Sequence, residues 1–199
     1  MATEVVLASR NDGKLAEMQV LFAPLRWKLR SIAEFSDEGA EETAQSYVEN
    51  ALLKARYAAL VSGLPAIADD SGLEVAELDG APGVRSARYA GDNASDSDNN
   101  QKLLAALKNI PDERRAARFV SVMVYLRNAE DTTPVIAQGS WRGTILHNPR
   151  GANGFGYDPL FFVPDLKRSA AELDAEVKNR ASHRGKAARH LFSMINDAG

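Results

Sequence analysis

Two adjacent carboxylates, Asp69 and Asp70, follow directly on an apolar run in the segment IADDSGLEV (67–75). The apolar residues 66–68 predict a short buried strand that ends where the acids begin. Two acids at a strand end repel each other, and one of them is costly unless a cation lies nearby. Because Mg²⁺ accepts one or two carboxylates together with phosphate oxygens, the pair predicts a magnesium site. The alternative is an ordinary turn, since Asp-Ser-Gly is favourable turn chemistry.

A second polar segment, SRNDGK (9–14), follows a predicted strand and opens a predicted helix. Backbone N–H groups at a helix start, with one glycine and Lys14, suit a bound phosphate. The spacing is not that of a Walker loop. A plain strand-to-helix turn capped by Asn11 or Asp12 therefore stays open as the alternative.

Charged side chains also accompany the next predicted helix. Glu41 and Glu42 precede it, where the helix dipole favours negative charge, and this is a sufficient account of Glu41. Lys54 lies five residues after Glu49 and so is not its simple i,i+4 partner. A lysine on a helix is usually just solvated, and nothing local to Lys54 indicates more.

Two later segments carry aromatic and basic side chains. GANGFGYDP (151–159) has three glycines around Phe155 and Tyr157, so a flat ligand could approach the backbone and stack on a ring. KNRASHRGKA (178–187) supplies four hydrogen-bond donors: Lys178, Ser182, His183 and Arg184. His and Arg oppose the dipole at a helix start, which favours a bound acceptor, although Ser182 also fits a plain N-cap. Together the four segments predict a site for a nucleoside triphosphate with magnesium.

The elements that must position these groups follow from the apolar spacing. Strands are expected at 4–8, 66–68, 117–127 and 134–146, and helices at 14–22, 46–63, 98–107 and 182–195. Ser46 and Glu49 form a capping-box pattern at the second helix. The order predicts an α/β domain with a mixed sheet. The polar stretch 91–101 resembles a calcium loop at Asp96, Asp98 and Asn100, but its sixth and twelfth positions are wrong for one.

The composition excludes several classes of protein. The 199 residues include no cysteine, which removes disulfides, thiolate zinc sites and a cysteine nucleophile. A net charge of −3 is a poor basis for binding nucleic acid. No apolar run approaches the roughly 20 residues that span a bilayer, and the N-terminal sequence does not resemble a signal peptide. We therefore expect one soluble, cytoplasmic domain over 1–199, with neither nucleic acid nor membrane as a partner.

Six motifs occur in the order found in the Ham1 family, the inosine/xanthosine triphosphate pyrophosphatases. They are SRNDGK, EETAQSYVENALLKAR, ADDSGLEV, GAPGVRSARYAG, GFGYDPLF and SHRGKA. The chain resembles this family from Val5 to about Leu191. The resemblance implies a two-lobed α/β fold with a long central mixed sheet flanked by helices and an active site in the cleft between the lobes. It also implies a homodimer that uses Mg²⁺ to cleave dITP, ITP and XTP into the monophosphate and pyrophosphate.

The resemblance assigns roles to particular residues of this sequence. The triphosphate would be held by Ser9, Asn11, Lys14 and Lys54. Magnesium would be bound by Glu42 and Asp70, with Asp70 also accepting the proton of the attacking water and Asp69 supporting it. Contacts to the rest of the substrate would come from Ser71, Phe155, Gly156, Tyr157, Asp158, Lys178, Ser182, His183 and Arg184, with Phe155 stacking on the base. Arg10 departs from the small residue of many relatives and adds a charge near the phosphates.

Two other functions stay open at this point. A regulator could sense purine triphosphates without cleaving them, although a pure sensor gains little from an acid pair. An RNA-binding module could use the basic segment 178–190, although the acidic net charge disfavours it.

Overall fold

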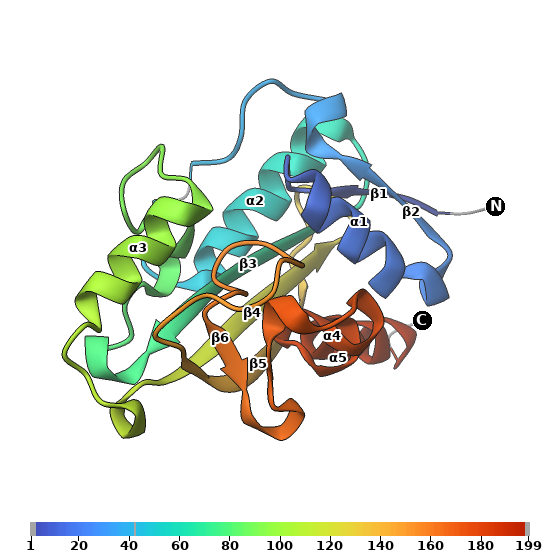
Figure 1. Cartoon of the computed structure of the whole chain (residues 1–199). Helices are drawn as coiled ribbons and strands as arrows, with labels where there is room; N and C mark the ends of the chain where they lie inside the picture. Colours follow the sequence, from blue (N-terminus) through green and yellow to red (C-terminus); the bar gives the residue numbers. More distant parts are fainter. Residues whose placement is uncertain (1–2, 42, 198–199) are drawn as a thin grey trace. The chain divides into compact units, whose positions relative to one another are not determined.

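The computed structural model describes residues 3–41 and 43–197 of the chain (Figure 1). The strands are β1 (Thr3–Leu7), β2 (Trp27–Ser31), β3 (Ala66–Val75), β4 (Ala116–Leu126), β5 (Val135–Ile145), β6 (Phe161–Val163) and β7 (Arg168–Ser169). The α-helices are α1 (Asp12–Leu21), α2 (Tyr47–Ser62), α3 (Asp96–Ala106), α4 (Ala175–Ala181) and α5 (His183–Asp197). The expected α/β class is confirmed.

The seven strands form one sheet in the order β2-β1-β3-β4-β5-β6-β7. Strand β1 is parallel to both β2 and β3, whereas β6 is antiparallel to both β5 and β7. The sheet is therefore mixed, as the order of predicted elements indicates. Leu7, the last residue of β1, pairs with Ile67, so β3 continues well beyond the carboxyl end of β1.

The chain divides into two compact units. Unit 1 comprises Met1–Asp70, Ser121–Gly139 and Arg184–Gly199, and unit 2 comprises Ser71–Val120 and Ser140–His183. Unit 1 packs α1 and α5 around residues such as Met18 and Leu191, both fully buried. Unit 2 has its own core, to which α3 supplies Leu103 and its C-terminal cap supplies Leu107. Each unit thus buries apolar surface of its own, the main favourable contribution to folding.

The ends of α1 and α2 follow the local sequence closely. Asn11 Oδ1 accepts from the Lys14 N–H at 2.9 Å and caps α1. Ser46 Oγ caps α2 by accepting from the Glu49 N–H at 3.4 Å, and it donates to the Glu49 carboxylate at 2.6 Å. Gly63 ends α2 with φ of +66°, a left-handed conformation that glycine adopts without a Cβ penalty.

The helix expected at 14–22 begins at Asp12, and three further predicted boundaries are wrong. Strand β3 does not end before the acids, but runs through both of them to Val75. The helix expected at 98–107 begins at Asp96, where Ser95 and Asp98 form a capping box. Ser182 does not open a single helix over 182–195, because it is the C-cap of the unpredicted α4 and α5 begins at His183. In each case the boundary is set by tertiary contacts or by capping residues, which the spacing of apolar residues does not reveal.

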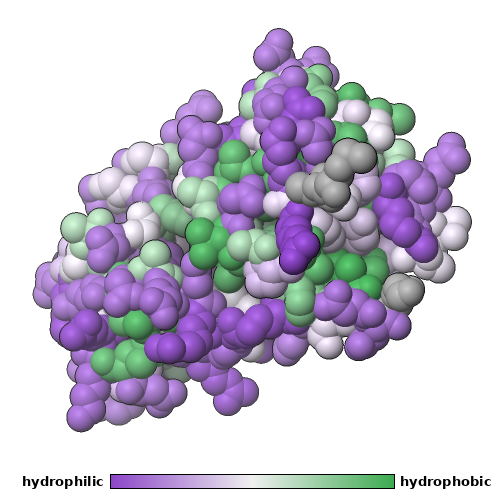
Figure 2. Space-filling model, turned by 90° about the vertical axis from the view of Figure 1, so that its right-hand side faces the viewer, coloured by the Kyte–Doolittle hydropathy of each residue, from purple (hydrophilic) through white to green (hydrophobic). Residues whose placement is uncertain are grey.

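On the face shown in Figure 2, hydrophilic side chains predominate and the apolar ones lie in several separate groups. Throughout residues 3–41 and 43–197, none of the helices has the length and apolar character needed to cross a membrane.

Asp131 fixes the connection between β4 and β5, and it should make stability sensitive to acid. Its side chain is almost fully buried and accepts from the backbone N–H groups of Arg127 and Thr133, both at 3.0 Å. The Arg127 guanidinium and these N–H groups hold the pKa of the Asp131 carboxyl well below its ordinary value. A depressed folded pKa contributes stability above the ordinary value of about 4, and this contribution is lost as the pH falls through the acidic range.

We therefore expect Asp131→Asn to lower the free energy of unfolding by about 1–3 kcal/mol at pH 7 and by less at pH 3. Urea unfolding of both proteins between pH 3 and pH 7 measures this difference. Glu130→Gln is the matched control, because Glu130 is exposed in the same turn. A loss that stays constant across this pH range would contradict the account.

Candidate functional site

The two acids of the opening segment point to opposite faces of β3. Side chains alternate along a strand, so Ile67 and Asp69 share one face and Ala68 and Asp70 share the other. Ile67 packs in the core cluster that includes α1 and α5 residues, whereas Ala68 packs against Ala55 of α2. Figure 1 shows α2 running alongside β3. The adjacent carboxylates therefore lie in two different environments within unit 1.

Asp69 is enclosed by hydrogen-bond donors. Its Oδ2 lies 2.9 Å from Lys14 Nζ of α1 and 2.9 Å from Arg184 Nε of α5. Its Oδ1 accepts from Ser121 Oγ of β4 at 2.6 Å. The side chain has no exposed surface. Asp69 thus links β3 to α1, β4 and α5 of unit 1, and both of its carboxylate oxygens accept hydrogen bonds in doing so.

Asp70 faces α2 and is slightly more accessible than Asp69. Its Oδ1 accepts from Lys54 Nζ at 2.6 Å, and Asn50 Nδ2 of α2 lies 3.5 Å from its Oδ2. The two acids do not lie at a strand end, because β3 runs through both, and each carboxylate has cations on its own face: Asp69 has Lys14 and Arg184, and Asp70 has Lys54. Both acids lie where β3 has passed the end of its parallel neighbour β1, the edge where α/β sheets bind ligands.

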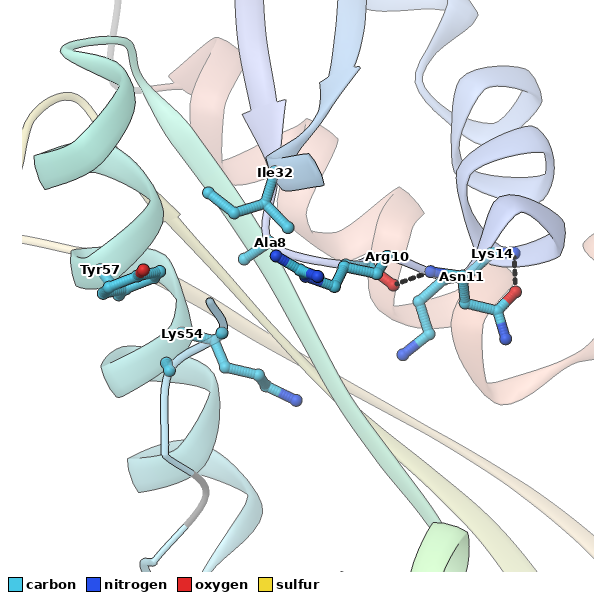
Figure 3. A pocket seen from close by; sticks show the side chains of 10 residues that line it. Ala8, Arg10, Asn11, Lys14, Ile32, Lys54 and Tyr57 are labelled. Atoms are coloured by element: carbon cyan, nitrogen blue, oxygen red, sulfur yellow. Dashed lines mark hydrogen bonds between the residues drawn. The ribbon is translucent and has the colours of Figure 1, made fainter. Parts of the chain in front are cut away.

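A cavity of about 270 Å³ lies beside this edge and is lined by the loop after β1, by α2 and by residues 39–40 (Figure 3). Its lining includes Ser9 and Asn11, together with three cations, Arg10, Lys14 and Lys54. None of the described lining residues is acidic. Figure 3 shows Arg10 and Lys54 extending into it from different elements. Such a cavity suits an anion with several charges.

The cations around the cavity are close to one another. Burial lowers the pKa of the Lys14 ammonium, Asp69 opposes this effect, and Arg184 and Lys54 add to it. A phosphate in the cavity would relieve this crowding of positive charge. The Arg10 guanidinium donates to the carbonyl oxygens of Ser36 at 2.5 Å and Glu38 at 3.2 Å, so it also ties the loop after β1 to the segment that leads toward residue 42.

The metal site expected from Glu42 and Asp70 is described only in part, since Glu42 lies outside the described residues. Within 3–41 and 43–197 no cluster of three or more acids, histidines or cysteines could hold a metal ion. A single carboxylate beside a cationic cavity nevertheless fits Mg²⁺, which binds through one or two carboxylates and substrate phosphates while keeping several waters. The Asp70 carboxylate is such a donor.

Three of the predicted base-binding residues, Phe155, Asp158 and Lys178, form a second cluster, within unit 2. Lys178 Nζ lies 2.5 Å from Asp158 Oδ2 and 5.0 Å from the centre of the Phe155 ring. The same Asp158 oxygen accepts from the Phe155 N–H at 2.9 Å. Gly154 has φ of +78°, and a Cβ there would lie 2.1 Å from the Asp158 oxygen. Only glycine fits at this point, so the loop can close over the ion pair.

Two further predicted residues of unit 2 are held by aromatic or hydrogen-bonding contacts. His183 is buried and stacks on Phe119, with ring centres 4.7 Å apart. The Tyr157 hydroxyl donates to the Ser86 carbonyl at 2.8 Å, and burial raises the pKa of this phenol. Ser182 is fully buried between α4 and α5, and Ser71 is half-buried on β3.

Arg184 follows His183 in sequence but makes its described contacts in unit 1. Besides Asp69, its guanidinium meets the Glu17 carboxylate at 3.2 Å.

The sequence did not indicate Glu17, Asn50 and Ser121 as partners of the predicted site residues. The clearest available signal was Ser121, a polar residue inside the apolar run 119–126.

An α/β sheet whose strand edge combines a cationic cavity with a buried carboxylate is typical of proteins that bind phosphorylated ligands. A sequence model of the Ham1 family matches residues 5–194. The chain therefore belongs to the Ham1 family.

Curated relatives match over the whole length. The chain is 53% identical over 195 residues to a dITP/XTP pyrophosphatase of Yersinia pseudotuberculosis serotype I (strain IP32953), covering 98% of this chain and 99% of the relative. It is 54% identical over 198 residues to a dITP/XTP pyrophosphatase of Aromatoleum aromaticum (strain DSM 19018 / LMG 30748 / EbN1), covering 100% of this chain and 99% of the relative. A solved structure of a Ham1 protein from Coxiella burnetii matches with a TM-score of 0.89 and 51% identity, over 98% of this chain and 99% of that one.

Proposed function

We propose that the whole chain acts as one nucleoside triphosphate pyrophosphatase that hydrolyses dITP, ITP and XTP to the monophosphate and pyrophosphate. The observation that carries the proposal is the cavity lined by Arg10, Lys14 and Lys54 beside the Asp70 carboxylate. Full-length similarity to relatives named dITP/XTP pyrophosphatases supports the substrate class. Hydrolysis of these substrates would remove deaminated purines from the nucleotide pool.

The phosphate chain is bound by Ser9, Asn11, Lys14 and Lys54 in this proposal. Asp70 takes a proton from the attacking water, whose oxygen bonds to the α-phosphorus while the bond to the pyrophosphate oxygen breaks. Lys54 lies 2.6 Å from Asp70 and can stabilise charge on the phosphate oxygens. Asp69 positions Lys14 and Arg184 rather than reacting itself, because its oxygens are already occupied.

Mg²⁺ is the proposed cofactor, and when bound it would offset phosphate charge in the transition state. Asp70 and Glu42 would hold it.

We also propose that the protein is a homodimer in the cytoplasm. This proposal rests on the family resemblance and on the composition. Light scattering of the purified protein measures the oligomeric state.

The purine base is proposed to bind to the unit 2 cluster. Phe155 stacks on it, with Gly156, Tyr157, Asp158 and Ser71 in contact with the substrate. The 6-position is read by the donors Lys178, Ser182, His183 and Arg184. Hypoxanthine and xanthine present an oxygen there, whereas adenine presents an amino group. Donors that would face another donor can discriminate by up to about 10⁴-fold.

Release of inorganic pyrophosphate from dITP, XTP, dGTP and dATP, with and without EDTA, tests the proposal. We expect rapid release from dITP and XTP, little from dATP, and loss of activity in EDTA that added Mg²⁺ restores. Binding of dITP without any release of pyrophosphate would instead favour a sensor that does not cleave its ligand.

A further inference from the structure

Helix α3 contacts the glycine-rich loop of the base-binding cluster through two side chains one turn apart. The Gly156 N–H donates to Asp96 Oδ2 at 2.6 Å, and Asn100 Nδ2 donates to the Gly156 carbonyl at 2.8 Å. Both backbone polar groups of one residue are therefore bound to one helix face. These are the residues whose spacing resembled a calcium loop, and neither belongs to the site assigned so far.

Gly156 is a position where the loop needs external support. Its φ is +63°, and a Cβ placed there would meet no atom within 4 Å, so a side chain at this position would have no neighbour to pack against. On one side of it stands Phe155, and on the other stand Tyr157 and Asp158. The orientation of the Gly156 peptide thus contributes to the placement of the Phe155 ring on one side and, together with the Lys178 ion pair, of the Asp158 carboxylate on the other.

Helix α3 is rigid enough to serve as this support. Leu103 and Leu107 are fully buried in the core of unit 2. Asn99, which is also buried, accepts from the Ala90 N–H at 2.8 Å and donates to the Ala87 carbonyl at 3.1 Å. Side chains that project from a packed helix hold a loop more accurately than contacts within the loop can.

Asn100 also lowers the stability of the fold at this position. Its Oδ1 is buried, and no described residue hydrogen-bonds to it. A buried acceptor without a partner destabilises the fold, so an apolar side chain at position 100 would give a more stable protein. The hydrogen bond from Asn100 Nδ2 to the Gly156 carbonyl explains why asparagine occupies this position.

We propose that Asp96 and Asn100, the α3 anchor, are positioning residues that fix the Gly156 peptide and thereby the purine-stacking loop. The inference rests on the proposed function for its effect on activity, but not for its effect on the loop. A loop without the anchor samples more conformations and must be ordered when substrate binds. The substrate KM should therefore rise, while the chemical step on Asp70 stays nearly unchanged.

Asp96→Ala and Asn100→Ala are the direct tests, measured by amide hydrogen exchange at Gly156 and by pyrophosphate release from dITP. We expect Gly156 to exchange about tenfold faster in Asp96→Ala, because its N–H loses its acceptor. The KM for dITP should rise roughly fivefold to tenfold in each variant, with kcat within about twofold of wild type. Asp96→Asn keeps an acceptor oxygen and should remain close to wild type.

Asp98→Ala is the matched control. Asp98 caps α3 through Ser95 but does not contact the loop, so this variant weakens the helix end alone. An equal rise in KM for Asp98→Ala would overturn the inference, as would unchanged Gly156 exchange or unchanged KM in Asp96→Ala. If the wild-type protein releases no pyrophosphate, the proposed function fails, and the exchange measurement alone decides whether the anchor exists.

Discussion

Asp70→Asn should lower kcat for pyrophosphate release from dITP by about 10³-fold, within the range expected for the loss of a general base. Asparagine has the shape of aspartate but cannot accept a proton from water at neutral pH. It also cannot supply the negative charge that a hard metal ion requires. The Lys54 ammonium, 2.6 Å from Asp70 Oδ1, would still find an oxygen acceptor, so the local geometry should persist.

The folded state should survive this substitution. Lys54 keeps some exposed surface and lines the cavity, where water or an anion can compensate for the lost carboxylate charge. Thermal unfolding of Asp70→Asn should therefore lie within a few degrees of wild type. Asp79→Asn serves as the control, because Asp79 is exposed in a turn and the same change there should leave turnover unaffected. Turnover near the wild-type rate in Asp70→Asn would remove Asp70 from the role of base.

The helices that carry the lysine partners of Asp69 and Asp70 could be predicted because their signals are local. Ser46 and Gly63 mark the two ends of α2 through capping chemistry that acts within one helical turn. Asn11 likewise caps α1 through the neighbouring Lys14 N–H. Such signals depend on residues a few positions apart, so a single sequence contains them.

The environment of the acid pair could not be predicted in the same way. Asp-Ser-Gly favours a turn locally, yet β3 continues through it because Asp69 meets Lys14, Ser121 and Arg184. These partners come from three separate elements and are brought together only by the fold. Tertiary contacts thus override the local turn preference. The alternation of faces along β3, which separates the two carboxylates, follows only once the strand is known to be continuous.

Helix α4 was missed for a different reason. It has only seven residues, too few to show an apolar period, and Lys178 reads as part of a basic segment. Asp174, which caps it through the Val177 N–H at 2.8 Å, was the available signal. The consequence for the site is that Lys178 lies within a helix and is buried beside Asp158.

Asp69→Asn should be the most destabilising single change at this site, although Asp69 is not proposed to react. We expect it to lower the free energy of unfolding by about 3–5 kcal/mol, the usual cost of removing one partner from a buried ion pair. Lys14 and Arg184 both lie 2.9 Å from the same Asp69 oxygen, and the carboxylate is fully buried. Neutralising it leaves two largely buried cations facing each other without the charge between them.

Urea unfolding in a phosphate-free buffer measures this loss, with Ser121→Ala as the matched control. Ser121 donates one neutral hydrogen bond to the same carboxylate, so removing it should cost only about 1 kcal/mol. If the lost charge of Asp69 causes the destabilisation, a second result is expected. Added inorganic triphosphate should recover more stability in Asp69→Asn than in wild type, because an anion in the neighbouring cavity replaces part of the missing charge. Equal recovery in the two proteins would mean that the loss comes from packing, and that Asp69 does not balance the cations of the phosphate cavity.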